Sequence, residues 1–431
     1  MANPGLGKTA VVFKYFAAFL ITISAFLVFS LLSVVLLPDK AVQRNIEKTI
    51  KYTKYYIDYP DPIIDGIQHR LDYAMDGQIT NIIYSINSKE PIQSALLGRS
   101  RMDQGYVSQW KYVEYNIKNK TQPTNNHYAR YWHGNSFLFR YFYSFLHFNE
   151  IKLYIFIITS LLITIFIMIS YKMAGSRKTL AIMAGLFFVN FYIMQFSMQM
   201  SPVLLITLII GMMILTRGKS DPKPPYMILF ITGMIVNYFD LLTAPVLTLG
   251  IPLLLYISLQ HDKEFTLKSF LTKATQLVTM GLLWLGGYAG AWIAKILITY
   301  PFCSFNLIDD FIAQFTLRAG AQEFSRFDAI DKNLNLIQLP AINLILLVLI
   351  ILAIVRFNRK GLLNSLLFIL IALTPFLWIA ATANHTYYHN WFTYRMLAVS
   401  VSGIMLAIIS LIDWEKLKKI RLNIRREKTD I

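Results

Sequence analysis

The residues best suited to chemistry lie close together near the C-terminal end of the chain. A twelve-residue polar and aromatic segment, 384–395, contains His385, His389 and Arg395. His385 and His389 are four residues apart, so a helix would place both on one face. Arg395 offers a permanent planar charge that suits phosphate, and the histidines can donate hydrogen bonds beside it. The segment predicts an anion site, while a zinc site, which needs further ligands, and an aromatic belt at a membrane surface stay open.

A carboxylate also lies between two apolar runs that are short for membrane spans. Asp240 belongs to the sequence Asn-Tyr-Phe-Asp-Leu-Leu-Thr-Ala-Pro at 237–245. A charge at or below the membrane surface is costly and is a functional hypothesis by default. The alternative is a helix cap made by Asp240 with Thr243.

Two arginines and a histidine occur in an aromatic part of the sequence before residue 150. Arg130 and His133 share a run of aromatic residues, and Arg140 lies inside the apolar stretch that follows. An arginine there needs a buried partner or a phosphate, unless it snorkels to the membrane surface. Lys295, near one end of a later apolar run, is expected to snorkel. Seven charged residues between 300 and 339 are expected to lie on a solvated surface and not to contact substrate; they are Asp309, Asp310, Arg318, Glu323, Arg326, Asp328 and Asp331.

These residues are embedded in a chain with the composition of a membrane protein. Hydrophobic residues make up 55% of 431 positions and charged residues 15%, whereas a soluble domain averages about 25% charged residues. A spanning helix needs about 20 apolar residues. Runs of roughly that length are expected to span at 11–37, 151–171, 179–198, 202–216, 226–240, 245–260, 274–299, 340–355, 364–383 and 394–412.

The charge pattern orients these spans. The net charge of +17 comes from short basic clusters between the apolar runs, which is the positive-inside pattern and not that of a nucleic-acid-binding surface. With ten spans the clusters fall on one side, so both termini are expected in the cytoplasm. The first run is too long for a signal peptide and lacks a cleavage site, so it should remain as a helix. Cys303, the single cysteine, excludes an intramolecular disulfide.

The chain is expected to form one membrane-embedded unit over residues 1–431, with its first span at 1–37. The segment 38–150 is too long for a connector and should carry structure. Its helical spacings and its many tyrosines and tryptophans predict helices lying at the outer interface; the spaced residues are Val42, Ile46 and Ile50, then Ile79, Ile82, Ile83 and Ile86. Nine further spans would occupy 151–412, with an outer loop at 300–339, before a basic cytoplasmic tail at 413–431. The expected fold is an all-α membrane protein, a polytopic bundle of about ten transmembrane helices with a large outer loop.

This order of elements resembles the C-type (GT-C) superfamily of glycosyltransferases, which use polyprenyl-phosphate-linked sugars. In that superfamily a first span leads to a large outer loop, and an acidic residue early in the loop acts on the acceptor. The run from Tyr131 through Arg140 to Lys152 is similar to the segment that ends this loop. The chain also looks like the phage-type serotype-converting glucosyltransferases and other bacterial enzymes that decorate surface polysaccharides.

The resemblance implies roles for individual residues. Asp39, directly after the first span, or Asp76, directly before the helix expected at 79–86, would be the catalytic base, and Asp240 would position the acceptor or replace them as base. The residues expected around the phosphate are Arg130, His133, Arg140, His385, His389 and Arg395. No obligatory cofactor is implied, and a divalent metal is compatible.

The function implied is transfer of a sugar from a polyprenyl-phosphate donor to a cell-surface glycan or lipid-linked acceptor. The site would face outward from the cytoplasmic membrane, and the partners would be the donor, the acceptor and the lipid bilayer, without nucleic acid. A transporter or flippase for a lipid-linked or anionic substrate is the main alternative, and a non-catalytic membrane scaffold is a third. Alternation between two faces without a transfer product would favour transport.

Overall fold

The computed structural model is almost entirely helical. It describes residues 4–52, 70–102, 108–120, 124–221, 223–260, 265–321, 323–337 and 339–416. In this part of the chain the only strands are β1 (Arg99–Ser100) and β2 (Asn126–His127), which pair antiparallel. The expected all-α architecture is therefore confirmed.

Six helical segments of the described chain are long and apolar enough to cross a membrane, which makes the chain a multi-pass membrane protein. They are Thr9–Leu36, Phe148–Ala174, Ser201–Gly218, Leu267–Phe302, Arg359–Ala381 and Asn390–Ser410. Three other apolar helices are shorter: α10 (Tyr226–Phe239), α11 (Leu247–Ser258) and α15 (Leu339–Val355). A 14-residue helix rises about 21 Å, against a hydrocarbon core of about 30 Å. The expected number of about ten spans is therefore not confirmed.

The remaining elements of the bundle connect and complete these spans. The long helices are α1 (Pro4–Leu36), α7 (Phe148–Ala174), α9 (Ser201–Ser220) and α12 (Leu267–Thr299), the last followed by η3 (Tyr300–Phe302). The segment 300–339 contains α13 (Leu307–Ala319) and α14 (Arg326–Leu334). The C-terminal part comprises η4 (Arg359–Gly361), α16 (Leu362–Ala372), α17 (Thr374–Ala381), α18 (Ala383–Tyr388), α19 (Asn390–Thr393), η5 (Tyr394–Leu397) and α20 (Ala398–Ser410).

The run expected to span at 179–198 is divided into two elements. α8 (Ser176–Phe188) ends, and the 3₁₀ helix η2 (Phe191–Phe196) follows. Between them Asn190 adopts a left-handed conformation, with a φ of 53°, which few residues other than glycine take readily. The Asn190 side-chain amide donates to the Tyr394 hydroxyl at 3.0 Å. This contact with a distant part of the chain stabilises a break that hydropathy does not reveal.

The segment 38–150 folds into a helical layer with an apolar core of its own. It contains α2 (Asp39–Tyr52), α3 (Tyr73–Tyr84), α4 (Pro91–Leu96), α5 (Gln109–Lys118) and α6 (Gly134–Tyr143). The helical spacings predicted around Val42 and Ile79 are confirmed, and both side chains are fully buried in one apolar cluster. Every residue of α3 except Met75 is buried, so α3 packs inside the protein and does not lie at the membrane interface as expected.

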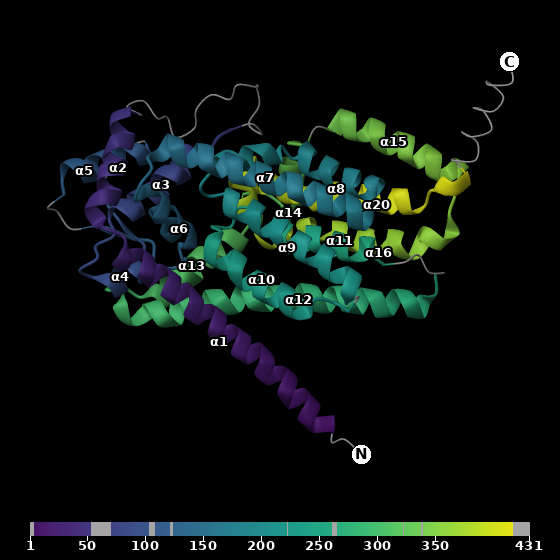
Figure 1. The fold of residues 1–431 in the computed structure, drawn as a ribbon, viewed down its shortest axis with the longest axis horizontal. Helices are drawn as coiled ribbons and strands as arrows, with labels where there is room; N and C mark the ends of the chain where they lie inside the picture. Colours follow the sequence, from purple (N-terminus) through teal and green to yellow (C-terminus); the bar gives the residue numbers. More distant parts are fainter. Residues whose placement is uncertain are drawn as a thin grey trace.

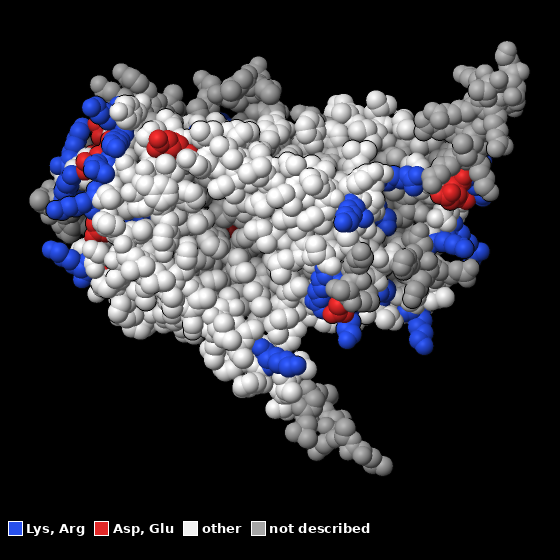
Figure 2. Space-filling model, in the orientation of Figure 1, with Lys and Arg blue, Asp and Glu red and all other residues white. Residues whose placement is uncertain are grey.

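The helices form an elongated bundle with two different ends. Figure 1 shows α2 to α6 gathered at one end, here called the loop end, while most of the bundle helices run along the long axis and α1 diverges from them toward the N-terminus. The opposite end, here called the basic end, is where α7 turns into α8, α15 turns toward α16, and α20 stops. Figure 2 shows charged side chains gathered at both ends, and the face between them is almost free of charge. That uncharged band is the part of the surface that suits a bilayer.

α10 and α12 approach each other backbone to backbone. A Cβ atom at Gly233 would lie 2.0 Å from the Trp284 carbonyl oxygen, and one at Gly287 would lie 2.1 Å from the Phe230 carbonyl oxygen. Small residues permit this approach, which lets two helices pack tightly where apolar surface alone does not drive association.

Substitution of Gly287 should separate α10 from α12. Gly287→Ala is expected to destabilise the protein by about 1–3 kcal/mol, because the added methyl group overlaps a backbone carbonyl. Gly286→Ala is the matched control, since its Cβ would meet nothing within 4 Å, and it should be neutral or slightly stabilising. Thermal unfolding of both variants in detergent measures the difference, and equal midpoints would contradict the close approach.

Candidate functional site

The junction between α1 and α2 holds an ion pair between Asp39 and Arg140. α1 ends at Leu36, and Asp39 begins α2, where its negative charge suits the helix N-terminus. Arg140 comes from α6, and its Nη2 lies 2.5 Å from Asp39 Oδ1. The side chain of Arg140 is 1% exposed and that of Asp39 is 22% exposed. Arg140 therefore has the buried partner that its place in an apolar stretch required, and it does not snorkel.

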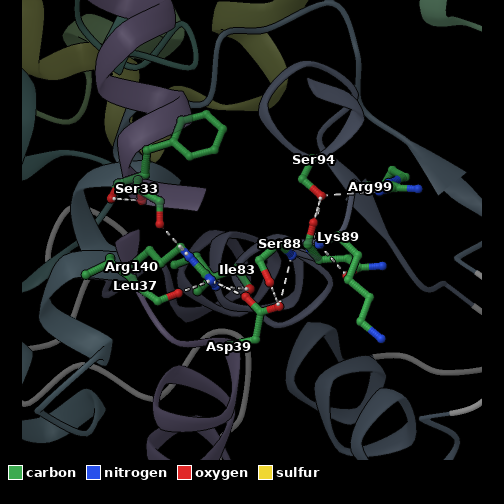
Figure 3. Close-up of polar contacts among 11 residues, drawn as sticks. Ser33, Leu37, Asp39, Ile83, Ser88, Lys89, Ser94, Arg99 and Arg140 are labelled. Carbon is green, nitrogen blue, oxygen red and sulfur yellow. Dashed lines mark hydrogen bonds and ion pairs between the residues drawn. The ribbon is translucent and has the colours of Figure 1, made fainter. Parts of the chain in front are cut away.

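Arg140 also satisfies backbone carbonyls at the ends of two helices (Figure 3). Its guanidinium donates to the carbonyls of Ser33 at 3.1 Å, Leu37 at 3.2 Å and Ile83 at 3.4 Å. The last carbonyls of a helix have no partner within the helix, so a cation at this position supplies one. Burial lowers the pKa of Arg140, and Asp39 raises it.

Asp39 also lines a polar cavity of about 430 Å³. Asp39 Oδ2 accepts hydrogen bonds from the Ser88 amide at 2.9 Å and the Ser88 hydroxyl at 2.8 Å. Most of the cavity wall is polar or charged; its residues are Asp39, Gln43, Tyr84, Ser85, Ile86, Asn87, Glu90, Arg99, Asn116, Lys120 and Thr124. A cavity of this size falls in the range of small-molecule sites, and its amides and hydroxyls suit a ligand rich in hydroxyl groups.

Two cations on the wall of this cavity are themselves paired with carboxylates. Arg99 Nη1 lies 2.6 Å from Glu90, and Lys120 Nζ lies 2.5 Å from Glu47. Sequence reasoning missed Ser88, which binds Asp39, and the wall residues Glu90, Arg99, Asn116 and Lys120. No spacing marks them, because they come from different helices and loops that meet only in the folded chain.

Asp76, the second residue expected to act as a base, is fully buried inside the protein. Its Oδ1 accepts from the Met198 amide at 2.9 Å, and its Oδ2 has no hydrogen-bond partner among the described residues. Burial raises the pKa of Asp76 to about 8, although Lys152 lowers it. Lys152 lies above the Tyr73 ring at 4.0 Å and donates to the Tyr73 hydroxyl. A carboxyl group that is protonated at neutral pH and has no solvent access is poorly placed to act as a base.

Asp240 forms the local turn that was the alternative to a catalytic role. It follows α10, and its Oδ1 accepts from both the amide of Thr243, at 2.9 Å, and the Thr243 hydroxyl. Asp240 Oδ2 is buried and has no partner among the described residues. Burial raises the pKa of Asp240 to about 7. Within the turn Leu242 has a φ of 66°, and its carbonyl lies 2.8 Å from His385 Nε2.

His385 and His389 lie side by side beneath this turn, with ring centroids 4.9 Å apart. Burial, together with the nearby His389 and Arg318, lowers the pKa of His385 to about 3, and burial together with Arg318 lowers that of His389 to about 4. Both rings are therefore neutral at pH 7 and cannot supply positive charge to an anion. The described residues contain no group of three potential metal ligands, so the zinc alternative gains no support in this part of the chain.

Arg395 points away from the two histidines. Its Nη1 donates to the Trp391 carbonyl at 2.6 Å, and its guanidinium lies 5.0 Å from the Tyr394 ring centroid. Trp391 contacts His389 on one side and donates from Nε1 to Asp72 Oδ2 at 3.4 Å on the other. The segment 384–395 thus links the Asp240 turn to α3. The sequence analysis did not single out Asp72 as a site residue. An aspartate directly before an amphipathic run does predict a helix N-cap, and Asp72 is the N-cap of α3.

Arg130, His133 and Lys295 form a third group, which connects the segment 38–150 with α12 and α13. Arg130 pairs with Asp310 of α13 at 3.1 Å, so Asp310 is part of a contact between segments and not only solvated surface. His133 Nε2 lies 2.6 Å from the Tyr128 carbonyl oxygen, and burial lowers the pKa of His133 to about 3. Lys295 is fully buried and donates to the Leu96 carbonyl at 2.5 Å. The expectation that Lys295 snorkels is wrong, because its ammonium group has a backbone partner inside the protein.

An apolar groove of about 270 Å³ lies between α6, α9 and α10. Its walls are almost entirely hydrocarbon and consist of Leu138, Pro202, Leu205, Ile206, Ile209, Ile210, Ile235 and Phe239. Ile209 is exposed at the surface of the bundle, and Phe239 directly precedes Asp240. The groove therefore suits an apolar chain entering from the lipid beside the Asp240 turn.

The structure does not gather the expected site residues into a single constellation. It joins Asp39 with Arg140, Asp240 with the two histidines, and Arg130 with Asp310. No known family model, curated protein or solved structure matches the chain, so the geometry is the basis for assigning a function.

Removal of Arg140 should be strongly destabilising. Arg140→Met is expected to lower the free energy of unfolding by about 3–5 kcal/mol, because it leaves Asp39 without its partner and buried carbonyls unsatisfied. Lys118→Met is the control, since Lys118 and Glu114 form a largely exposed pair that contributes at most about 1 kcal/mol. Equilibrium unfolding in detergent and denaturant measures both values. Equal losses would contradict a structural role for Arg140.

Asp240 should make stability fall as pH rises. Its pKa is about 7 in the folded protein, against an ordinary value of 3.8. The unfolded chain therefore loses this proton first, and the stability contributed by the protonated carboxyl is lost between about pH 4 and pH 7. Asp240→Asn should flatten this decline between about pH 4 and pH 7 in thermal unfolding. The exposed Asp309→Asn should retain it, and parallel curves for wild type and Asp240→Asn would refute the assignment.

Proposed function

We propose that the protein is a membrane glycosyltransferase that moves a sugar from a polyprenyl-phosphate donor to a cell-surface glycan or lipid-linked acceptor. The observation that carries this proposal is the Asp39–Arg140 pair at the wall of the 430 Å³ polar cavity. It joins the first acidic residue after the first span to an arginine of the segment that ends the loop. Those are the two places at which the sequence resembles the superfamily.

In this proposal Asp39 is the catalytic base and the polar cavity receives the acceptor. Asp39 removes the proton of an acceptor hydroxyl as its oxygen forms a bond to the anomeric carbon of the donor sugar. The bond from that carbon to the phosphate oxygen breaks, and polyprenyl phosphate leaves with the electron pair. Arg140 holds Asp39 in position, while Arg99 and Lys120, each paired with a carboxylate, line the cavity.

The apolar groove supports a lipid-linked donor. It lies against Leu138, whereas Arg140, two residues farther along α6, pairs with Asp39, which lines the polar cavity. Two residues of an α-helix are separated by about 200°, so α6 divides a hydrocarbon side from a polar side. Such a divide suits a substrate with an apolar chain and a polar head.

The proposed location is the cytoplasmic membrane, with the basic end in the cytoplasm and the loop end outside. Arg177, Lys178, Arg359 and Lys360 lie at the basic end, and the positive-inside rule places such residues on the cytoplasmic side. Both termini would then be cytoplasmic, and the Asp39 cavity would face the donor at the outer surface.

A transporter or flippase is the second candidate, and the short helices α10 and α11 favour it. They meet at the buried Asp240 turn, and interrupted helices beside a buried carboxylate are typical of transport sites. Movement of a lipid-linked sugar across vesicles without any transfer product would favour this function over the first.

Replacement of Asp39 tests the proposed function. With purified protein, a polyprenyl-phosphate sugar and cell-envelope acceptors, Asp39→Asn should reduce the transfer rate by about 10²–10⁴-fold. Asp76→Asn is the matched control, because the amide resembles the protonated carboxyl of Asp76, and its rate should stay close to wild type.

A second variant tests the cavity without changing the ion pair between Asp39 and Arg140. Gln43→Ala removes an amide from the wall of the cavity and should raise KM for the acceptor while the unfolding midpoint stays unchanged. Transfer by folded Asp39→Asn at the wild-type rate would remove Asp39 as the base. The absence of transfer by wild-type protein with every donor and acceptor offered would count against the function itself.

A further inference from the structure

A large cavity lies at the basic end, far from the polar cavity of the loop end. It has a volume of about 1010 Å³ and is bounded by the α7–α8 turn, the segment 357–360 and the segment 409–416. Figure 2 shows blue side chains gathered around this end of the molecule. None of the residues assigned to the proposed transfer reaction lines it.

The charge of the cavity wall is strongly positive. Its cationic residues outnumber its two acidic residues, Asp413 and Glu415; they are Arg177, Lys178, Arg359, Lys360 and Lys416. Asp413 lies 3.4 Å from Lys416, so part of the acidic charge is already matched within the wall. The excess of cations selects an anionic ligand.

The wall is held in shape by backbone hydrogen bonds between two chain segments. The Asn358 amide donates to the Leu411 carbonyl at 2.8 Å, and the Asp413 amide donates to the Arg356 carbonyl at 2.7 Å. A Cβ atom at Gly361 would lie 1.7 Å from the Ser410 carbonyl oxygen, so these segments touch directly. The cationic side chains therefore project from an ordered frame.

The first turn of α8 adds backbone donors to the same wall. Ser176, Arg177 and Lys178 begin this 13-residue helix, and no side chain caps its N-terminus. The amides of a first helical turn point along the axis and favour an anion together with the helix dipole. Arg177 is held in place by the Trp414 ring, at 4.2 Å from its centroid.

The surroundings of the cavity favour a lipid as the source of the anion. Phe357 lines the cavity and is 53% exposed, and Ile354 and Leu180, which lie near wall residues in the sequence, are 74% and 70% exposed. In a multi-pass protein such surfaces meet acyl chains. A phosphate held in the cavity would thus have hydrocarbon next to it, as the head group of a phospholipid does, and basic pockets between helices at the cytoplasmic surface bind such head groups.

We propose that this cavity binds the phosphate of an anionic phospholipid of the surrounding membrane. The cationic side chains and the α8 amides contact the phosphate oxygens, and the apolar side chains Ile354 and Leu180 border the acyl chains. The site does not depend on the sugar-transfer reaction and would exist in a transporter as well.

The test uses the full chain in nanodiscs and measures lipid binding by native mass spectrometry and thermal unfolding. Wild-type protein should retain phosphatidylglycerol in preference to phosphatidylcholine. Arg177→Gln combined with Lys360→Gln should weaken phosphatidylglycerol binding roughly 25-fold, since each cation near a membrane surface contributes about fivefold. Lys89→Gln combined with Lys118→Gln, two exposed cations of the loop end, is the matched control and should retain wild-type binding.

Each other outcome overturns the proposal. Equal loss of binding in both double variants would mean that only general charge attracts the lipid. The absence of a preference for phosphatidylglycerol would remove the anionic head group as ligand. Stabilisation by inorganic phosphate as strong as that by the lipid would assign the cavity to a soluble phosphate instead. Arg177→Lys combined with Lys360→Arg keeps the charge and should restore binding if the site is as proposed.

Discussion

The loop end of this protein depends on one buried guanidinium. Arg140 contacts the carboxylate of Asp39 and the carbonyls of Ser33, Leu37 and Ile83. Burial of an unpaired charge is strongly unfavourable, so these partners must be in place whenever α6 is packed. Because they come from α1, the α1–α2 junction and α3, the same contact fixes the direction in which the chain leaves its first span. The polar cavity beside Asp39 exists only in that arrangement.

The need to satisfy buried polar groups shapes the rest of the molecule in the same way. Lys295 donates to the Leu96 carbonyl, and Asn190 donates to the Tyr394 hydroxyl. His385 is hydrogen-bonded to the Leu242 carbonyl. Each contact joins segments far apart in the sequence, and in a membrane no water is present to replace it. Polar residues that resembled a phosphate site in the sequence are thereby used, in this structure, to hold turns and helix ends. An excess of positive charge that could attract an anion is found instead at the basic end.

A considerable part of this could be predicted from the sequence. The requirement of Arg140 for a buried partner was correct, because an arginine inside an aromatic stretch has few alternatives. The helical spacing of Val42, Ile46, Ile79 and Ile83 was also correct. The prediction that His385, His389 and Arg395 surround a phosphate fits the structure less well. The rings of His385 and His389 lie beside each other, whereas the Arg395 guanidinium donates to the Trp391 carbonyl. Burial keeps both histidine rings neutral, and the spacing of residues in the sequence does not reveal burial.

By itself the sequence determined that the chain is helical, apolar and multi-pass, because long apolar runs and their flanking charges are local properties of the chain. It also placed polar residues at the boundaries of those runs. Only the tertiary structure decided which of those residues meet. Asp39 and Arg140 are 101 residues apart, and the number of spans depends on breaks such as Asn190 that distant contacts stabilise. Pairing and burial are properties of the packed chain, so the polar cavity and the cationic cavity could not be read from the order of its residues.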